Sequence, residues 1–130
     1  MPALRENALT KVASKTGVSL NTTVKTSLFI VPTGKTFVAT HVLVRNVSGP
    51  APAADADFGI GAAANDFRAS VQFDNLAATG DGVMVTPYDG GASTPVPGKV
   101  ETYAAGDDFG IKVGTVVAVT VDVDVFGWLF

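Results

Sequence analysis

The side chains that carry most enzyme chemistry are scarce in this sequence, which has one histidine, His41, and no cysteine. Nucleophilic catalysis needs a serine, cysteine or threonine held against a general base. His41 lies in the middle of an apolar segment, and the chain contains no Gly-x-Ser-x-Gly motif. We therefore expect His41 to be a hydrogen-bonded or partly buried strand residue, and we expect the protein not to be an enzyme.

Paired carboxylates are the second candidate for chemistry, because glycosidases use two of them at the scissile bond. Three pairs of aspartates lie close together in the sequence: Asp55 and Asp57, Asp107 and Asp108, and Asp122 and Asp124. A spacing of two on a strand puts both carboxylates on one face, where calcium would find suitable oxygen ligands. No stretch fits the calcium-loop pattern, so we predict no metal and no cofactor, and solvated strand faces whose charge protects sheet edges. Structural calcium at these pairs remains the alternative.

A glycine-rich segment, Gly59-Ile60-Gly61-Ala62-Ala63-Ala64, superficially matches a dinucleotide-binding fingerprint. That fingerprint requires a helix directly after the glycines. The following residues, Phe67–Phe73, alternate like a strand, so we assign no nucleotide site.

The elements that position these groups are strands. Fourteen glycines and seven prolines are scattered at turn-like intervals, and the apolar segments alternate with a period of two. The one exception is Met1–Val12, which has the composition of a short helical turn. Val117–Val125 gives the strongest strand pattern, with a valine at every second position. The other expected strands are Ser27–Val31, Thr36–Asn46, Asp57–Gly61, Phe67–Phe73, Val83–Thr86, Val100–Tyr103 and Phe109–Val113.

The long strand Thr36–Asn46 is apolar on both faces, which indicates burial on both. Simple alternation puts His41 on the same face as Phe37, Ala39 and Leu43, and it puts the remaining apolar residues on the opposite face: Val38, Val42 and Val44.

The end of the chain carries an aromatic row. Asp122 and Asp124 lie on one face of the last strand. The same face continues with Phe126, Trp128 and Phe130, and Gly127 lies between the first two rings. A monomer would have to leave these rings in water or turn them inward through a bulge at Gly127. Each ring can bury about 150–250 Å², so we predict that these three residues form the interface of a homo-oligomer. Closure of the monomer's own core is the alternative.

Charge is unevenly distributed along the chain. Residues 1–45 contain six lysines and arginines against one glutamate, whereas residues 46–130 contain three against eleven acids. This pattern is typical of a basic arm on an acidic body. We expect Arg5, Lys11 and Lys15 to contact an acidic partner or the acidic body of another copy. The acidic body argues against nucleic acid, and no stretch approaches the roughly 18–20 apolar residues of a membrane span.

Two turn-and-strand segments, Leu28–Val38 and Tyr103–Ile111, resemble hairpins of small jelly-roll proteins encoded by tailed bacteriophages. The resemblance covers about residues 26–130 and implies an all-β fold, a jelly-roll-type antiparallel β-sandwich of about eight strands in a single domain. Residues 1–25 would precede it as an arm or first strand, partly extended.

The functional implication of this resemblance is a head decoration (cement) protein. Such a protein binds between subunits of the major capsid protein as a homotrimer on the capsid exterior, after synthesis in the host cytoplasm. The alternative is a carbohydrate- or receptor-binding jelly-roll domain of a phage tail fibre or tip. The family brings no catalytic residues.

Overall fold

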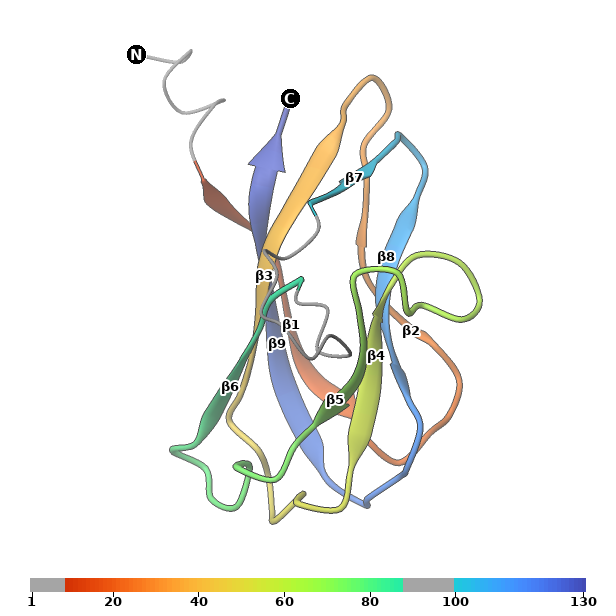
Figure 1. Ribbon diagram of the computed structural model, residues 1–130. Helices are drawn as coiled ribbons and strands as arrows, with labels where there is room; N and C mark the ends of the chain where they lie inside the picture. The colour runs from red at the N-terminus through yellow and green to blue at the C-terminus, as the bar shows by residue number, and fades with distance from the viewer. Residues whose placement is uncertain (1–8, 88–99) are drawn as a thin grey trace, which may run out of the picture.

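The computed structural model describes residues 9–87 and 100–130. These residues form nine β-strands and no helix, in two antiparallel sheets that face each other as a sandwich (Figure 1). This confirms the predicted all-β, single-domain fold. The strands are β1 (Thr10–Ser19), β2 (Thr26–Ile30), β3 (Phe37–Arg45), β4 (Asp55–Gly59), β5 (Arg68–Gln72), β6 (Gly82–Val85), β7 (Glu101–Tyr103), β8 (Asp108–Val113) and β9 (Thr120–Leu129).

The topology is that of a jelly roll. Sheet A has the strand order β1-β9-β3-β6, and sheet B has the order β2-β8-β4-β5. The pairs β1/β9, β2/β8, β3/β6 and β4/β5 therefore alternate between the two sheets, as in one long hairpin rolled up on itself. In Figure 1, sheet A lies on the left and sheet B on the right.

The ninth strand arises because one strand position of sheet A is filled in two pieces. β6 pairs with the Val42–Arg45 part of β3, and β7 pairs with its Phe37–Ala39 part. Both pieces lie on the same side of β3, since β9 occupies the other side. The jelly roll thus keeps eight strand positions, as expected.

The core lies between the sheets and confirms the valine pattern of the last strand from Val121 to Val125. The pattern is wrong for Val117–Val119, which precede the start of β9 at Thr120. Val121, Val123 and Val125 of β9 are fully buried. They face a cluster of aromatic rings in which Phe37 and Phe109 have centroids 6.3 Å apart. Burying each of these side chains contributes roughly 1.5–3 kcal/mol before chain entropy is counted.

Residues 1–25 were expected to form either an arm or a first strand. Their described part contains a strand: Thr10–Ser19 pairs antiparallel with β9. The last three residues of Met1–Val12, a segment with the composition of a helical turn, begin β1 instead; residues 1–8 lie outside the described part of the chain. β5 also follows the glycine-rich segment, which confirms that no helix comes directly after Gly59–Ala64.

The faces of β3 differ from simple alternation because the strand contains a bulge. The register with β9 shifts between Ala39 and His41, so Thr40 is an extra residue. Phe37 and Ala39 remain on the inner face, but His41 and Leu43 move to the outer face, and burial on both faces is wrong. The buried inner residues of β3 are Phe37, Ala39, Val42 and Val44.

Among residues 9–87 and 100–130, Tyr103 is the one large core side chain with an unmet polar group. It is 2% exposed, and its hydroxyl has no hydrogen-bond partner. Burial, and next the negative charge of Asp66, raise the pKa of Tyr103 far above its usual range. Because a buried hydroxyl without a partner is destabilising, Tyr103→Phe is expected to keep stability unchanged or raise it by up to about 1 kcal/mol.

Chemical denaturation would measure this effect. The control, Phe109→Ala in the same aromatic cluster, should lower the free energy of unfolding by about 3–5 kcal/mol. A loss above about 1 kcal/mol for Tyr103→Phe would show that the hydroxyl is bonded after all.

Candidate functional site

The outer face of sheet A, which points away from sheet B, carries an apolar patch. Residues paired across an antiparallel ladder project on the same side. Val38 pairs with Trp128, and His41 pairs with Phe126. The patch, called the aromatic face below, consists of Val38, His41, Leu43, Met84, Phe126 and Trp128, with Leu9 and Phe130 at its end.

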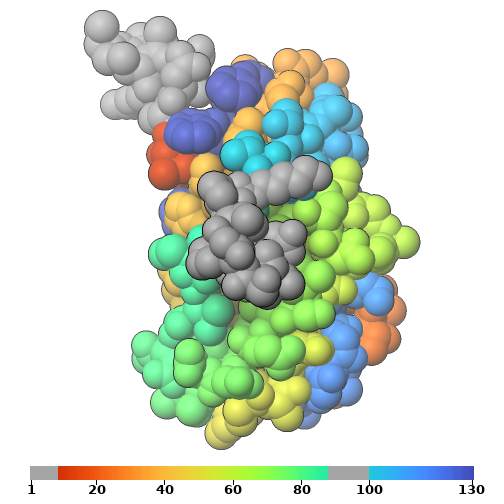
Figure 2. Space-filling model, viewed as in Figure 1, coloured from red at the N-terminus to blue at the C-terminus, as the bar shows by residue number. Residues whose placement is uncertain are grey.

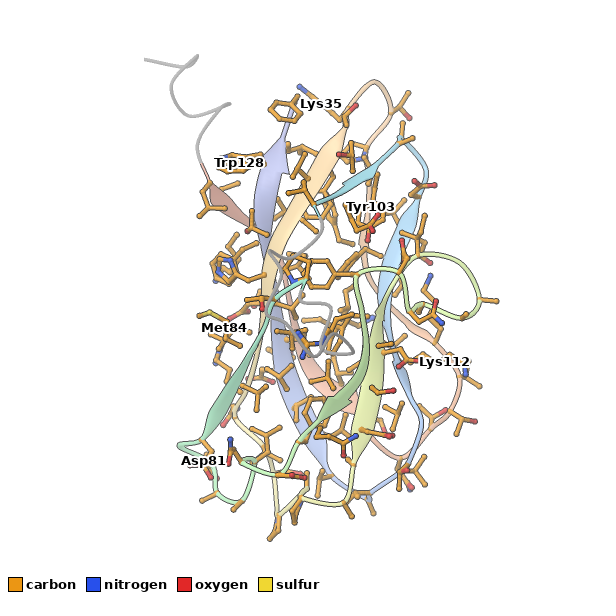
Figure 3. All side chains as sticks on the ribbon, in the orientation of Figure 1. Lys35, Asp81, Met84, Tyr103, Lys112 and Trp128 are labelled. Atoms are coloured by element: carbon orange, nitrogen blue, oxygen red, sulfur yellow. The ribbon has the colours of Figure 1, made fainter. Side chains whose placement is uncertain are left out.

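Much of the aromatic face is open to solvent. Trp128 is 38% exposed, Phe130 is 53% exposed and Met84 is 63% exposed. Figure 3 shows Trp128 and Met84 projecting from the same side of the molecule. In the space-filling view of Figure 2, the last residues, in dark blue, lie at the surface beside the red start of β1. The rings therefore do not close the monomer's own core.

Gly127 explains why the aromatic row stays outside. A Cβ atom at Gly127 would collide with the ring of Phe37 and with the carbonyl oxygen of Val38. The glycine thus lets β9 pass close to β3 on the inner face while Phe126 and Trp128 point outward. The bulge at Gly127 that would have turned the rings inward is absent from β9, and the register shifts lie in its neighbours, at Thr40 of β3 and at two places in β1, between Lys11 and Ala13 and between Lys15 and Val18.

His41 is built into this face by its ring. The imidazole stacks on Phe126 with centroids 4.4 Å apart and planes 10° apart. The Thr40 hydroxyl donates a hydrogen bond to the Phe126 carbonyl oxygen at 3.1 Å. The Thr40 hydroxyl has only one proton, and this hydrogen bond uses it. In the second contact of Thr40 Oγ1, with His41 Nδ1 at 3.1 Å, the imidazole N–H is therefore the donor. His41 is half-buried and hydrogen-bonded, as the sequence predicted.

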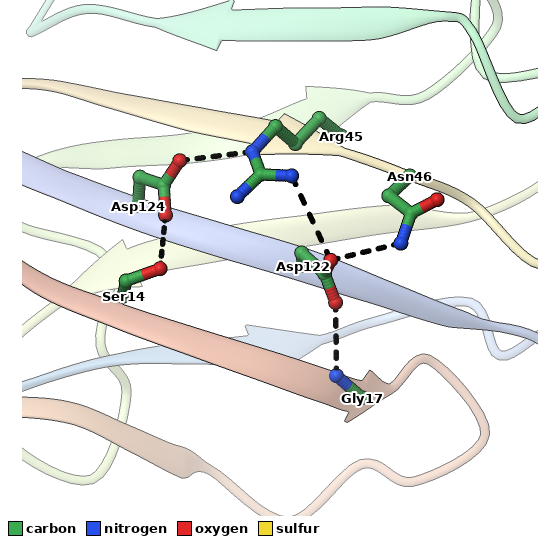
Figure 4. A network of polar contacts seen from close by, with 6 residues as sticks. All are labelled: Ser14, Gly17, Arg45, Asn46, Asp122 and Asp124. Atoms are coloured by element: carbon green, nitrogen blue, oxygen red, sulfur yellow. Dashed lines mark hydrogen bonds and ion pairs between the residues drawn. The ribbon is translucent and has the colours of Figure 1, made fainter.

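A polar network lies beside the patch on the same face (Figure 4). Asp124 of β9 is only 4% exposed. One of its oxygens accepts from Ser14 Oγ of β1 at 2.5 Å, and the other accepts from Arg45 Nε of β3 at 3.0 Å. Asp124 therefore connects three neighbouring strands, and the prediction of a solvated face is wrong for this residue, because Arg45 and Ser14 supply its hydrogen bonds in place of water.

Asp122 makes a second set of connections one step along β9. Its Oδ1 accepts from the backbone N–H of Gly17 at 3.1 Å, and its Oδ2 accepts from Asn46 Nδ2 at 2.9 Å. Arg45 forms a looser ion pair with the same carboxylate at 3.7 Å. The hydrogen bonds from Asn46 and Gly17 lower the pKa of Asp122.

Opposing effects act on the neighbouring carboxylate. Burial favours the protonated form of Asp124, but the hydrogen bonds from Arg45 and Ser14, together with the positive charge of Arg45, outweigh it and lower the pKa of Asp124.

The other aspartate pairs fix backbone turns and strand ends. Asp55 accepts from the N–H of Thr115 at 2.6 Å, and Asp57 accepts from the N–H of Ser70 at 2.7 Å. Asp107 and Asp108 accept from the Ala104 N–H at 2.9 Å and the Ser27 hydroxyl at 2.5 Å. Within residues 9–87 and 100–130, no three histidine or acidic side chains gather where they could hold a metal ion.

Two of the three basic residues predicted to contact a partner lie in the described part of the chain. Lys11 and Lys15 are exposed on β1, and the Lys15 ammonium donates to the Ser27 carbonyl oxygen at 3.1 Å. Arg5 lies outside the described residues. The described part of the chain contains no helix long and apolar enough to span a bilayer.

The chain was compared with protein-family models, with curated proteins and with solved structures, and nothing matched in any of the three.

Proposed function

We propose that this protein is a virion structural protein that decorates and cements a phage capsid, binding between major capsid subunits as a homotrimer on the exterior of the shell. The observation that carries the proposal is the aromatic face, because contiguous exposed apolar patches mark sites of protein contact. The jelly-roll topology supports it, since capsid domains use this architecture. Binding that favours the assembled shell would stabilise it by mass action.

In this proposal, two surfaces of the protein make the contacts with other subunits. Phe126, Trp128 and Phe130 contact the neighbouring copy, and Lys11 and Lys15 contact the capsid or the acidic body of another copy. Attachment results from burial of the aromatic rings at an interface and from ion pairs between the lysines and carboxylates of the partner. Burying one such ring contributes roughly 1.5–3 kcal/mol, which corresponds to at least about a tenfold change in affinity.

The aromatic face can be tested by replacing two exposed rings with serine. Trp128→Ser with Phe130→Ser is expected to weaken self-association by at least about a hundredfold, because both rings lose their burial at the interface. Sedimentation equilibrium measures the self-association. The control is Val116→Ser, which removes an apolar side chain that is 42% exposed in the connection from β8 to β9, outside this face.

Attachment to a shell needs its own measurement. Cosedimentation of the protein with capsids, assembled from the major capsid protein encoded in the same genome, is expected to be saturable and to fall in the double serine variant. A wild-type protein that stays in the supernatant would contradict the capsid proposal. A double variant that associates like Val116→Ser would contradict the role of the aromatic face.

The alternative function is a carbohydrate- or receptor-binding domain of a tail fibre or tip. The observation that favours it is the ring of Trp128, which is 38% exposed on a sheet face beside the stacked pair of His41 and Phe126. Aromatic rings present an apolar surface with a polar edge, which suits the faces of sugar rings. Binding to a glycan array that Trp128→Ser abolishes, without capsid binding, would favour this alternative.

A further inference from the structure

One edge of the sandwich is basic. β1 is the outermost strand of sheet A, β2 is the outermost strand of sheet B, and the two strands contact each other. Residues 9–31, which contain both strands, carry Lys11, Lys15 and Lys25 and no carboxylate. The neighbouring carboxylates are engaged in contacts of their own: Asp122 and Asp124 of β9 share the single positive charge of Arg45, and Asp108 of β8 accepts from the Ser27 hydroxyl.

The opposite edge is acidic. It is formed by β5 of sheet B and by β6 and β7 of sheet A. Asp74 and Asp81 lie in the connection from β5 to β6, and Glu101 lies on β7. Figure 3 shows Asp81 beside the start of β6. Among the described residues of this edge, Arg68 is a cation and donates to the Thr86 carbonyl oxygen.

The two edges are too far apart to neutralise each other within one copy. Three strand spacings separate β1 from β6, which is about 14 Å at the usual spacing of about 4.8 Å. Charges on a surface are screened over about 8 Å at physiological salt. Each copy therefore presents a positive edge and a negative edge to its surroundings.

Apolar side chains accompany both edges. Leu9, 51% exposed, and Trp128 lie beside the basic edge, at the β1–β9 end of the aromatic face. Met84 is on β6, and Val100, 66% exposed, directly precedes β7. The two edges are thus complementary in charge, and each has apolar side chains to bury against the other.

We propose that copies of this protein associate head to tail, with the β1–β2 edge of one copy against the β6–β7 edge of the next. Such a heterologous contact uses two different surfaces and closes into a ring when the rotation allows it; a ring of three is the homotrimer of the proposed function. The inference deepens that self-association by naming the two surfaces. It can fail while attachment to a capsid holds, because the two are measured separately.

Charge reversal at each edge separates this arrangement from a symmetric one. The first variant is Lys11→Glu with Lys15→Glu, which makes both edges acidic. The second is Asp74→Lys with Thr102→Lys, which makes the β6–β7 edge basic and uses exposed positions that leave the backbone contacts of Asp81 in place. Each variant alone is expected to associate at least tenfold more weakly than the wild type. An equimolar mixture regains association between unlike copies, because each reversed edge meets its opposite there. A ring of three must keep one contact between like copies, so the regained species are unlike pairs and alternating chains and not the closed trimer.

Sedimentation equilibrium of each variant and of the mixture provides the readout, with circular dichroism to verify folding. The regained association should be strong at about 0.01 M salt and weak at about 1 M, where screening acts over about 30 Å and about 3 Å. If a variant fails to fold, Lys11→Gln with Lys15→Gln replaces it and should show a smaller loss. A monomeric wild type, a reversed variant that associates normally, or a mixture that stays monomeric would overturn the proposal.

Discussion

Gly127→Ala is expected to lower the free energy of unfolding by at least about 3 kcal/mol, the upper end of what overpacking usually costs, and Gly127→Val is expected to prevent folding. The added Cβ would overlap the ring of Phe37 and the carbonyl oxygen of Val38. Phe37 cannot move aside, since it is fully buried and packs edge-on against Phe29 with centroids 5.0 Å apart. The backbone of β3 cannot move either without breaking its pairing with β9.

Gly82→Ala is the matched control for this prediction. Gly82 lies in β6 of the same sheet, and its added Cβ would meet the Val44 carbonyl oxygen at 3.5 Å, an ordinary contact. Urea denaturation should show a change within about 0.5 kcal/mol for this variant. Equal losses for both glycines would mean that Gly127 acts through backbone freedom and not through space. Adding Phe37→Leu to Gly127→Ala should restore part of the loss, because the overlap with Val38 remains.

Strands that bury one whole face were predictable from sequence, whereas β1, a strand held by its neighbours, was only one of two alternatives. Every second residue of β9 from Val121 to Val125 is buried, so its period of two is visible in the sequence. In β1 the only residue that is buried is Val18. β1 is ordered by its ladder with β9 and by the contacts of Ser14 and Gly17 with aspartates more than a hundred residues away in sequence, which no local pattern records.

A single extra residue accounts for the error on the faces of β3. A shift of one residue exchanges the two faces of a strand, so the bulge at Thr40 puts His41 and Leu43 on the side opposite to the one that alternation predicts. The register shift lies directly beside Gly127, which is the partner of Ala39 in β9. Nothing in the local sequence of β3 marks it.

The aromatic face was only partly predictable for the same reason. Phe126, Trp128 and Phe130 are spaced two residues apart along the last strand and its end, so the sequence alone indicates that they share one face. Met84 joins them from β6 through its pairing with Leu43, which depends on the fold. Arg45, the partner of Asp124, is 79 residues away from it in sequence, so the conversion of an acidic strand face into an ion-pair network could not be foreseen.

The second large effect is expected in acid. Asp122 and Asp124 have lowered pKa values in the folded protein, whereas free aspartates titrate near pH 3.9. Carboxylates of this kind contribute stability that is fully present above the unfolded pKa and is lost as the pH falls through the lower, folded pKa. The free energy of unfolding should therefore be nearly constant from about pH 7 to pH 5 and should fall steeply below about pH 4.

Asp124→Asn should remove part of this dependence while lowering stability at neutral pH by about 1–3 kcal/mol, because it weakens the buried hydrogen bonds to Ser14 and Arg45. Asp74→Asn, an exposed change outside the network, is the control and should leave the curve as it is. Denaturation between about pH 2 and pH 7 measures both. A variant curve parallel to the wild type throughout would rule out Asp124 as a source of the acid sensitivity.

The part of the protein that loses stability first in acid follows from the strands that Asp122 and Asp124 connect. Protonation weakens the contacts of β9 with Ser14 and Gly17 of β1, whereas the valines that join β9 to the core carry no charge. Hydrogen exchange in mild acid should therefore expose the amides of Thr10–Gly17 before those of β3 and β9, since local opening begins where few apolar contacts hold a strand. Equal rates of amide exchange in all three strands would show that the network stabilises sheet A as a whole and that β1 does not open separately.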